Sequence, residues 1–397
     1  MQATAGPAVV RGFRFAGVSA GIKTSGTTDL GLIVADRPAA AAAVFSANRV
    51  KAAPVYVTMD HIRGGRLQAV VANSGCANSF TGKPGLKLAH DSCAIVARAI
   101  GCAPELVVPS STGVIGHLFD LAKLEAGVRE AVTRLAADGL EDFARAVMTT
   151  DTRPKIASAS FPMGGATVTI AGAAKGSGMI APKMATMLAY IVTDAALSAA
   201  QLKTALKAAL PHSFNAITVD GDMSTNDTVI LMASAAAANR APSRRDLDAF
   251  NSAITAISAL LARELVRDGE GATKLVEVHV RGARSPADAE RFARQIANSP
   301  LVKTAFFGCD PNVGRILMAA GSSGAAVESD RLMLSIGGVK VAARGALITE
   351  ALPQAAAKMR EREFTVDLDL RLGRARATIL TCDLSYDYVK INAEYTT

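Results

Sequence analysis

The chain has 397 residues, of which 50% are hydrophobic, and it carries a formal net charge of +8 at pH 7. A chain of this length can bury a substantial core and is expected to form two lobes rather than one. Its basic residues are scattered and lack interleaved aromatic side chains, because the sequence has no Trp and only 5 Tyr. The composition therefore argues against a nucleic-acid partner.

Membrane and secretory segments are not expected. The N-terminus, MQATAGPAVVRGFRF, lacks a continuous apolar stretch. The closest later candidate, residues 229–238, is much shorter than the roughly 20 apolar residues that a transmembrane helix needs. We therefore expect a cytoplasmic protein with no membrane partner.

Metal and disulfide sites are not expected either. The five cysteines are an odd number without a CxxC pair, which disfavours both a disulfide framework and a zinc site. The histidines lack metal-ligand spacing, and no HExxH pattern occurs. The thiols are interpreted as reduced and mostly buried.

Hydrophobic periodicity predicts an α/β fold. Apolar residues recur every three or four positions in helices expected over residues 86–101, 121–136, 198–210 and 247–269. Alternation and β-branched runs predict strands over residues 67–73, 166–172, 187–194 and 274–283, and a hairpin-like pair over 364–384. Helices and strands are interspersed without regular βαβ order, so we expect mixed sheets layered between helices, an α+β arrangement.

Seven polar, glycine-containing clusters separate these elements. Small polar residues in loops are where binding and catalytic sites are usually built, although a single cluster is commonly an ordinary turn. Seven in one chain favour a site assembled from distant segments. The clusters are residues 73–82, 110–116, 148–155, 215–227, 267–274, 308–315 and 391–397.

The segment KGSGMIAPKMATMLAYIVTD, residues 175–194, is unusual because glycines, a proline and small residues lead directly into an apolar, strand-like run. Its start fits GxGxxA through Gly176, Gly178 and Ala181, which resembles a dinucleotide-binding fingerprint with Asp194 as the acidic residue. That fingerprint needs a helix, whereas a proline and a β-like run follow here. The phosphate-loop pattern and the GxSxG elbow of hydrolases do not occur.

Thr186 offers a different chemistry. In a strained turn its hydroxyl can attack the carbonyl of Ala185, and hydrolysis of the resulting ester cuts the chain. The new threonine has a free α-amine with an unperturbed pKa of about 7.7–8.0, so it can accept the proton of its own hydroxyl. Ala185 is small and leaves room for the tetrahedral intermediate. Composition alone does not distinguish this from a threonine that simply begins a strand.

The whole segment closely resembles the self-cleavage segment of the ornithine acetyltransferase family, also called bifunctional glutamate N-acetyltransferase, of arginine biosynthesis. The resemblance spans nearly the whole chain. Further stretches look like family motifs in the family order: SSTGVIG, MTTDTRPK, ITVDGDMSTND, LVRDGEGATKLVEV, NSPLVKTAFFGCDPN and DYVKINAEYTT. It implies a self-cleaving, N-terminal-nucleophile-like architecture.

The resemblance also assigns roles to residues. It implies cleavage between Ala185 and Thr186, which gives an α chain of residues 1–185 and a β chain of residues 186–397. Thr186 is the implied nucleophile, and Thr112 and Gly113 are the implied oxyanion hole. The substrate contacts it implies are Thr149, Lys175, Thr186, Glu270, Asn392 and Thr397. A cation such as Lys175 and an anion such as Glu270 suit a zwitterionic amino acid.

The implied reaction is ping-pong. N-acetylornithine acetylates Thr186, ornithine leaves, and glutamate takes the acetyl group. No metal or organic cofactor is implied, bifunctional relatives also accept acetyl-coenzyme A as donor, and the assembly is a heterotetramer of two α and two β chains. Two alternatives stay open: a threonine-nucleophile amidohydrolase or aminopeptidase acting on another N-acyl amino acid, and a nucleotide-binding module using GxGxxA.

The chain departs from the family pattern at several positions. Lys183 stands where relatives usually have a smaller polar residue, which puts the rate of cleavage in doubt. Val313 replaces a tryptophan and either widens a pocket or repacks a core. Cys76 and Ser79 vary the stretch at 73–82. The C-terminal tail carries residues of the implied pocket, so we expect it to be ordered.

Overall fold

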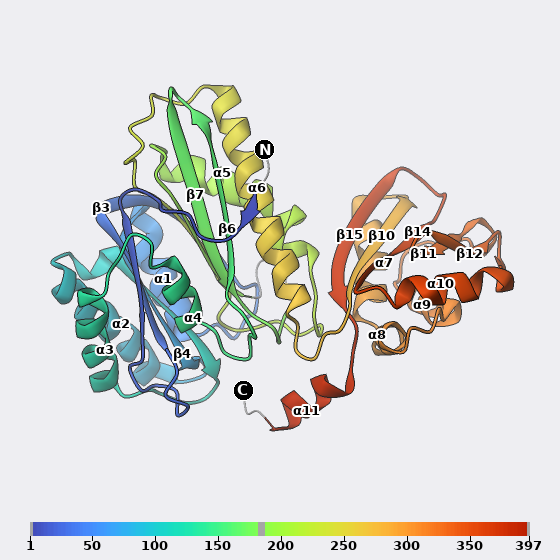
Figure 1. Ribbon diagram of the computed structural model, residues 1–397, viewed down its shortest axis with the longest axis horizontal. Coiled ribbons are helices and arrows are strands. Elements are labelled where there is room, and N and C mark those ends of the chain that lie inside the picture. Colours follow the sequence, from blue (N-terminus) through green and yellow to red (C-terminus); the bar gives the residue numbers. More distant parts are fainter. Residues whose placement is uncertain (1–2, 182–186, 395–397) are drawn as a thin grey trace.

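The chain folds into a larger and a smaller lobe, connected by a long helix and the loop that follows it (Figure 1). The computed structural model describes residues 3–181 and 187–394. The larger lobe contains the N-terminal half of the chain, and the smaller lobe begins after residue 274. A short C-terminal helix leaves the smaller lobe and runs back toward the larger one (Figure 1). The expectation of two lobes is confirmed.

The larger lobe is built on one mixed sheet. Within the described residues its order is β1-β6-β7-β8-β9-β3-β4-β5, with β2 paired to β3. The β8–β9 and β4–β5 pairs are parallel and the others antiparallel. The strands are β1 (Thr4–Ala5), β2 (Phe13–Val18), β3 (Leu30–Phe45), β4 (Arg66–Cys76), β5 (Val107–Val114), β6 (Lys155–Met163), β7 (Ala166–Lys175), β8 (Leu188–Thr193) and β9 (Thr228–Ala233).

Strand β3 makes this sheet fold over on itself. Residues 30–34 and 39–40 of β3 pair with β4, with a register shift between Val34 and Ala39, and residues 40–45 pair with β9. The two halves enclose a shared core that contains Phe15, Phe143 and Tyr190. Helices α1 (Ala53–His61), α2 (Gly82–Ile100), α3 (Leu121–Thr133), α5 (Ala199–Ala209) and α6 (Arg244–Arg267) cover the outer faces, whereas α4 (Leu140–Ala146) packs into the shared core. This confirms mixed sheets layered between helices.

The predicted helices of this lobe are confirmed, and their ends have local causes. The N-termini of α5 and α6 are closed by capping boxes, Ser198 with Gln201 and Ser243 with Asp246. Helix α2 ends on Gly101, whose φ of 75° is a conformation that glycine adopts readily. By length and composition α6 would suffice to cross a bilayer, but half of its most apolar window is buried, as in a core helix.

The smaller lobe has a second mixed sheet with its own core. The order is β13-β12-β11-β14-β10-β15. Its strands are β10 (Leu275–Ala283), β11 (Met333–Ile336), β12 (Val339–Ala343), β13 (Ala346–Leu347), β14 (Glu363–Asp369) and β15 (Ala375–Cys382). The helices are α7 (Pro286–Asn298), α8 (Pro300–Phe307), α9 (Val313–Gly321), α10 (Leu352–Met359) and α11 (Tyr386–Glu394).

The hairpin expected over residues 364–384 is wrong. Strands β14 and β15 form, but β10 lies between them, parallel to β14 and antiparallel to β15. The physical reason is burial: residues 275, 276, 278 and 280 of β10 are almost fully buried, and a central position satisfies both backbone edges of so apolar a strand. Short-range alternation cannot reveal an inserted strand whose partners in β14 lie 88 residues later, as Leu275 and Glu363 do.

The predicted division at 185/186 stays a prediction. Both segments contribute strands to the first sheet, since β7 precedes and β8 follows that position and the two pair antiparallel.

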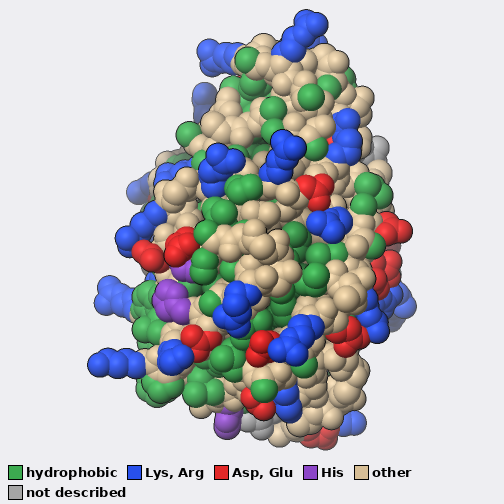
Figure 2. Space-filling view, turned by 90° about the vertical axis from the view of Figure 1, so that its left-hand side faces the viewer, with side chains coloured by type: hydrophobic (Ala, Val, Ile, Leu, Met, Phe, Trp, Pro, Cys, Tyr) green, Lys and Arg blue, Asp and Glu red, His purple; other side chains and the backbone are tan. Residues whose placement is uncertain are grey.

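On the face in Figure 2, Lys and Arg side chains are interspersed with Asp, Glu and uncharged groups, as expected for a solvated surface.

Replacing Phe143 by alanine tests the central core. Phe143 is fully buried and stacks edge-on against Tyr190, with ring centroids 4.9 Å apart. We expect the free energy of unfolding to fall by about 3–5 kcal/mol, because the deletion leaves a cavity between the sheet halves. Denaturation in urea measures it. The control is Phe80→Ala, since Phe80 is 80% exposed, with an expected change of about 0.5 kcal/mol or less.

Candidate active site

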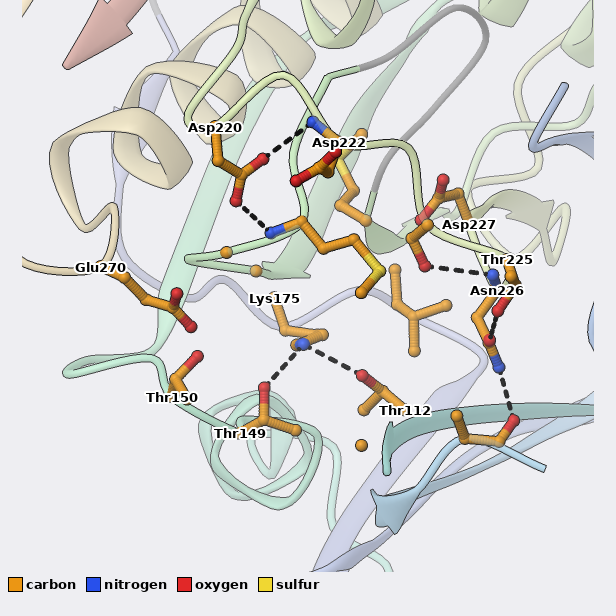
Figure 3. A pocket seen from close by; sticks show the side chains of 18 of the residues that line it. Thr112, Thr149, Thr150, Lys175, Asp220, Asp222, Thr225, Asn226, Asp227 and Glu270 are labelled. Atoms are coloured by element: carbon orange, nitrogen blue, oxygen red, sulfur yellow. Dashed lines mark hydrogen bonds between the residues drawn. The ribbon is translucent and has the colours of Figure 1, made fainter. Parts of the chain in front are cut away.

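Six of the seven polar clusters meet at one cavity of about 430 Å³ in the larger lobe (Figure 3). These six clusters lie at the ends of β4, β5 and α6, in the loops before β6 and β9, and on α11. The lining residues are Ala77, Thr112, Gly113, Ile115, Thr149, Thr150, Lys175, Gly176, Gly178, Met179, Met187, Leu188, Asp220, Asp222, Met223, Ser224, Thr225, Asn226, Asp227, Glu270, Tyr388 and Asn392. The prediction of a site built from distant segments is confirmed for these six.

The seventh cluster, residues 308–315, lies elsewhere. It connects α8 to α9 in the smaller lobe, where Val313 is 7% exposed and belongs to the second core. Val313 also lines a separate, mostly apolar cavity of the smaller lobe. Val313 therefore both packs in a local core and lines a neighbouring pocket, away from the candidate active site.

Lys175 is the centre of the described site. It ends β7, and its side chain is buried in the cavity wall. Its Nζ donates hydrogen bonds to Thr112 Oγ1 at 3.0 Å and Thr149 Oγ1 at 2.9 Å (Figure 3). These three residues come from separate segments, and the family resemblance had implied a role for each of them.

Asp151 provides the counter-charge for this lysine. Its Oδ2 lies 4.0 Å from Lys175 Nζ, and its Oδ1 accepts the backbone N–H of Gly176 at 2.7 Å. Burial alone would favour the neutral acid, but the ammonium groups of Lys155 and Lys175 hold the pKa of Asp151 at about 2. Burial lowers the pKa of Lys175, and Asp151 opposes that shift. The site therefore keeps a buried ion pair.

Thr112 and Gly113 lie at a bulge near the end of β5. The register with β4 shifts there, so that Cys76 faces both Thr112 and Val114. Gly113 has a φ of 124°, and a Cβ on it would lie 2.4 Å from the backbone carbon of Gly75. Only glycine fits such an approach. The bulge turns the Thr112 hydroxyl toward Lys175.

Glu270 and Asn392 lie on the opposite side of the cavity. Glu270 is 7% exposed, and its Oε2 accepts the Nδ2–H of Asn392 at 2.8 Å. Gly178 lets this carboxylate approach, because a Cβ there would lie 2.4 Å from Glu270 Oε2. Asn392 is on α11, so the described part of the tail forms a helix.

Other predicted residues fall outside the described part of the chain. These are the cleavage pair Ala185 and Thr186, Thr397 and Lys183. Met187, directly after Thr186 in sequence, lines the cavity, and its carbonyl accepts the N–H of Thr228 at 3.0 Å. The assignments at Ala185, Thr186 and Thr397 stay predictions.

The dinucleotide-fingerprint interpretation is wrong. Gly176 and Gly178 belong to a connection between β7 and β8, which pair antiparallel, whereas the fingerprint needs a helix that leads to a parallel strand. Asp220 closes this turn by accepting the N–H of Met179 and of Ile180, the latter at 2.8 Å. Asp194 lies at the far end of β8, where it pairs with Arg11 at 2.7 Å.

Sequence reasoning missed individual roles within the flagged clusters. Asn226 donates from Nδ2 to the carbonyls of Ala77 at 2.6 Å and Ser111 at 2.8 Å, and so fastens the strand that carries Thr112. Asp227 is 2% exposed, and its Oδ2 has no hydrogen-bond partner within the described chain. Burial raises the pKa of Asp227 well above its usual value. The motif ITVDGDMSTND marked the loop but not these contacts.

Two departures from the family pattern lie beside the cavity. Cys76 is buried at the bulge, and its Sγ donates to the His117 carbonyl at 3.1 Å. Ser79 donates from Oγ to Thr225 Oγ1 at 2.8 Å. Within the described residues no group of three or more His, Cys, Asp or Glu side chains lies close enough to hold a metal ion.

Comparison with known proteins gives a consistent result. The ArgJ family model matches residues 14–397. A protein of Geobacter sulfurreducens named arginine biosynthesis bifunctional protein ArgJ is 50% identical over 391 residues, which cover 98% of this chain and 100% of that protein. A namesake from Symbiobacterium thermophilum is 47% identical over 390 residues, covering 97% of each. A crystal structure of the Bacillus halodurans protein of that name is 40% identical, with a TM-score of 0.49, over 51% of this chain and 96% of its own.

Asp227→Asn tests the buried carboxyl group. An acid whose pKa is raised by folding stabilises the protein below its unfolded pKa, near 3.8, and loses that contribution as the pH rises toward the folded value. Asparagine does not titrate, so the melting temperature of the variant relative to that of the parent should increase as the pH rises above about 4. Asp36→Asn, at an exposed position, controls for the lost charge. A difference that is constant with pH would contradict the account.

Proposed function

Because the chain belongs to the ArgJ family, we propose that it is an ornithine acetyltransferase, or glutamate N-acetyltransferase, of arginine biosynthesis. It moves an acetyl group from N-acetylornithine to glutamate. The observation that supports this most is the buried Lys175, which joins the implied oxyanion residue Thr112 to the implied substrate residue Thr149 in one cavity.

The proposed nucleophile is Thr186, freed by cleavage of the Ala185–Thr186 bond. Its α-amine takes the proton of its own Oγ as Oγ attacks the acetyl carbonyl. The acetyl C–N bond then breaks, and the same amine returns the proton to the ornithine nitrogen that leaves. Glutamate attacks the acetyl-threonine ester in the second half, which frees Oγ and yields N-acetylglutamate.

The hydrogen bonds of Thr112 suit it to stabilise an oxyanion. Its Oγ1 accepts from the Lys175 ammonium, so its own O–H remains free to donate into the cavity. A donor aimed at developing negative charge contributes about 3–4 kcal/mol to such reactions. The backbone N–H of Gly113 is the proposed second donor.

The charges of the cavity suit an amino-acid substrate. Thr149 Oγ1 also accepts from Lys175, so its O–H can donate to a substrate carboxylate beside the ammonium. Glu270 across the cavity suits the substrate ammonium, with Asn392 holding its carboxylate. Thr397 is a further proposed contact. N-acetylornithine carries both the carboxylate and, on its side chain, the ammonium group that this arrangement requires.

The remaining features of the proposal come from the family resemblance. The reaction needs no metal or organic cofactor, and acetyl-coenzyme A is a candidate second donor. The α chain, residues 1–185, and the β chain, residues 186–397, assemble as a heterotetramer of two of each in the cytoplasm.

The decisive assay for the proposed function supplies N-acetylornithine with and without glutamate. We expect N-acetylglutamate and ornithine to form in equal amounts when glutamate is present, and little free acetate in its absence. Chromatography of the amino acids measures both. Release of acetate at the same rate without glutamate would instead indicate an amidohydrolase.

Self-cleavage is tested separately with Thr186→Ala. The parent should run on a denaturing gel as two fragments, residues 1–185 and 186–397, and the variant as one uncut chain, because alanine has no hydroxyl to attack the preceding carbonyl. Cleavage of the alanine variant at the same place would rule out Thr186 as the agent.

A further inference from the structure

A buried ion triad lies behind the cavity, formed by Asp151, Lys155 and Asp268. Lys155 is 1% exposed, and its Nζ donates to Asp151 Oδ1 at 2.6 Å and Asp268 Oδ2 at 2.5 Å. Both carboxylates are also buried. Burying three charged groups is costly unless each is paired and hydrogen-bonded, so a triad at this depth needs a reason.

Each carboxylate of the ion triad fastens backbone that carries a cavity residue. Asp151 Oδ2 accepts the N–H of Thr149 at 3.0 Å, and its Oδ1 accepts the N–H that follows Lys175. Asp268 lies two residues before Glu270, at the end of α6. The triad therefore connects three segments, and each contributes one residue to the proposed substrate contacts.

Further hydrogen bonds connect the same three segments to one another. Asp268 accepts both the N–H of Thr152, at 3.0 Å, and its hydroxyl. Ser177 shares a hydrogen bond between its Oγ and Thr150 Oγ1 at 2.7 Å, and its carbonyl accepts the N–H of Glu270 at 2.9 Å. Displacing one segment therefore disturbs the other two.

Asp151 links the charges of the ion triad to the cavity lysine. Two carboxylates face the ammonium groups of Lys155 and Lys175, and Asp151 is shared between them. Loss of Lys155 would leave Asp268 without its ammonium partner and Asp151 paired with Lys175 alone. The ion triad thus fixes where Lys175 lies as well as the charge around it.

We propose that the ion triad is a positioning device, which holds the cation and the anion of the cavity at the spacing that one amino-acid substrate spans. Asp151, Lys155 and Asp268 act through Thr149, Lys175 and Glu270. The identity of the substrate, but not the positioning itself, rests on the proposed function.

The test is the double variant Lys155→Met/Asp268→Asn. It removes one positive and one negative charge, leaves Asp151 paired with Lys175, and keeps an oxygen on residue 268 for Thr152. We expect a folded protein in which KM for N-acetylornithine and for glutamate rises at least tenfold, and amide exchange accelerates in residues 148–155 and 268–274. Asp268→Asn alone is measured in the same way and serves if the double variant does not fold.

The matched control is Arg11→Met/Asp194→Asn. This pair also joins a buried carboxylate, 1% exposed, to a cation across the same sheet, at 2.7 Å and away from the cavity residues. It should lower the melting temperature without changing either KM. A folded triad variant with the KM values and amide exchange of the parent would overturn the inference. A parent that transfers no acetyl group would count against the proposed function, while the exchange rates would still decide whether the triad positions the loops.

Discussion

The hydrogen bonds of one buried ammonium group hold the described site together. Lys175 Nζ donates to the hydroxyls of Thr112 and Thr149 and lies beside the carboxylate of Asp151. An unpaired ammonium at that depth would be strongly destabilising, so these contacts fix the relative positions of β5, β7 and the loop before β6. The same bonds leave two hydroxyl protons free to point into the cavity.

The fold explains why residues so far apart in sequence meet. Because β3 pairs with β4 at one end and with β9 at the other, the sheet folds over and brings the end of β5 beside the end of β7. Glu270 follows the C-terminal end of α6, and Asn392 on α11, which runs back from the smaller lobe, donates a hydrogen bond to it. Such a site is made of strand ends, which are rigid, and of short loops tied by buried hydrogen bonds.

The sequence predicted the elements whose signals are local. Capped amphipathic helices such as α5 and α6 were evident, and the motifs around Thr112, Thr149, Lys175 and Glu270 converge as the resemblance implied. The insertion of β10 between β14 and β15 was not predictable, since a pairing such as Leu275 with Glu363, 88 residues apart, leaves no periodic trace. Nor does alternation along the C-terminal tail reveal a helix that is held through Asn392.

The roles of residues that hold the backbone in place through hydrogen bonds also could not be predicted from the sequence. Asp151, Asn226 and Asp268 are ordinary members of polar clusters until their partners are known. Their contribution comes from burial, which makes each hydrogen bond harder to replace by water. The difference between a turn and a site therefore lies in tertiary contacts.

Mass spectrometry of the protein mixed with N-acetylornithine, without glutamate, shows whether Thr186 becomes acetylated. We expect one acetyl group on the 186–397 fragment, located on Thr186, which disappears when glutamate is added. A fragment that stays unmodified while N-acetylglutamate is being formed would contradict this expectation.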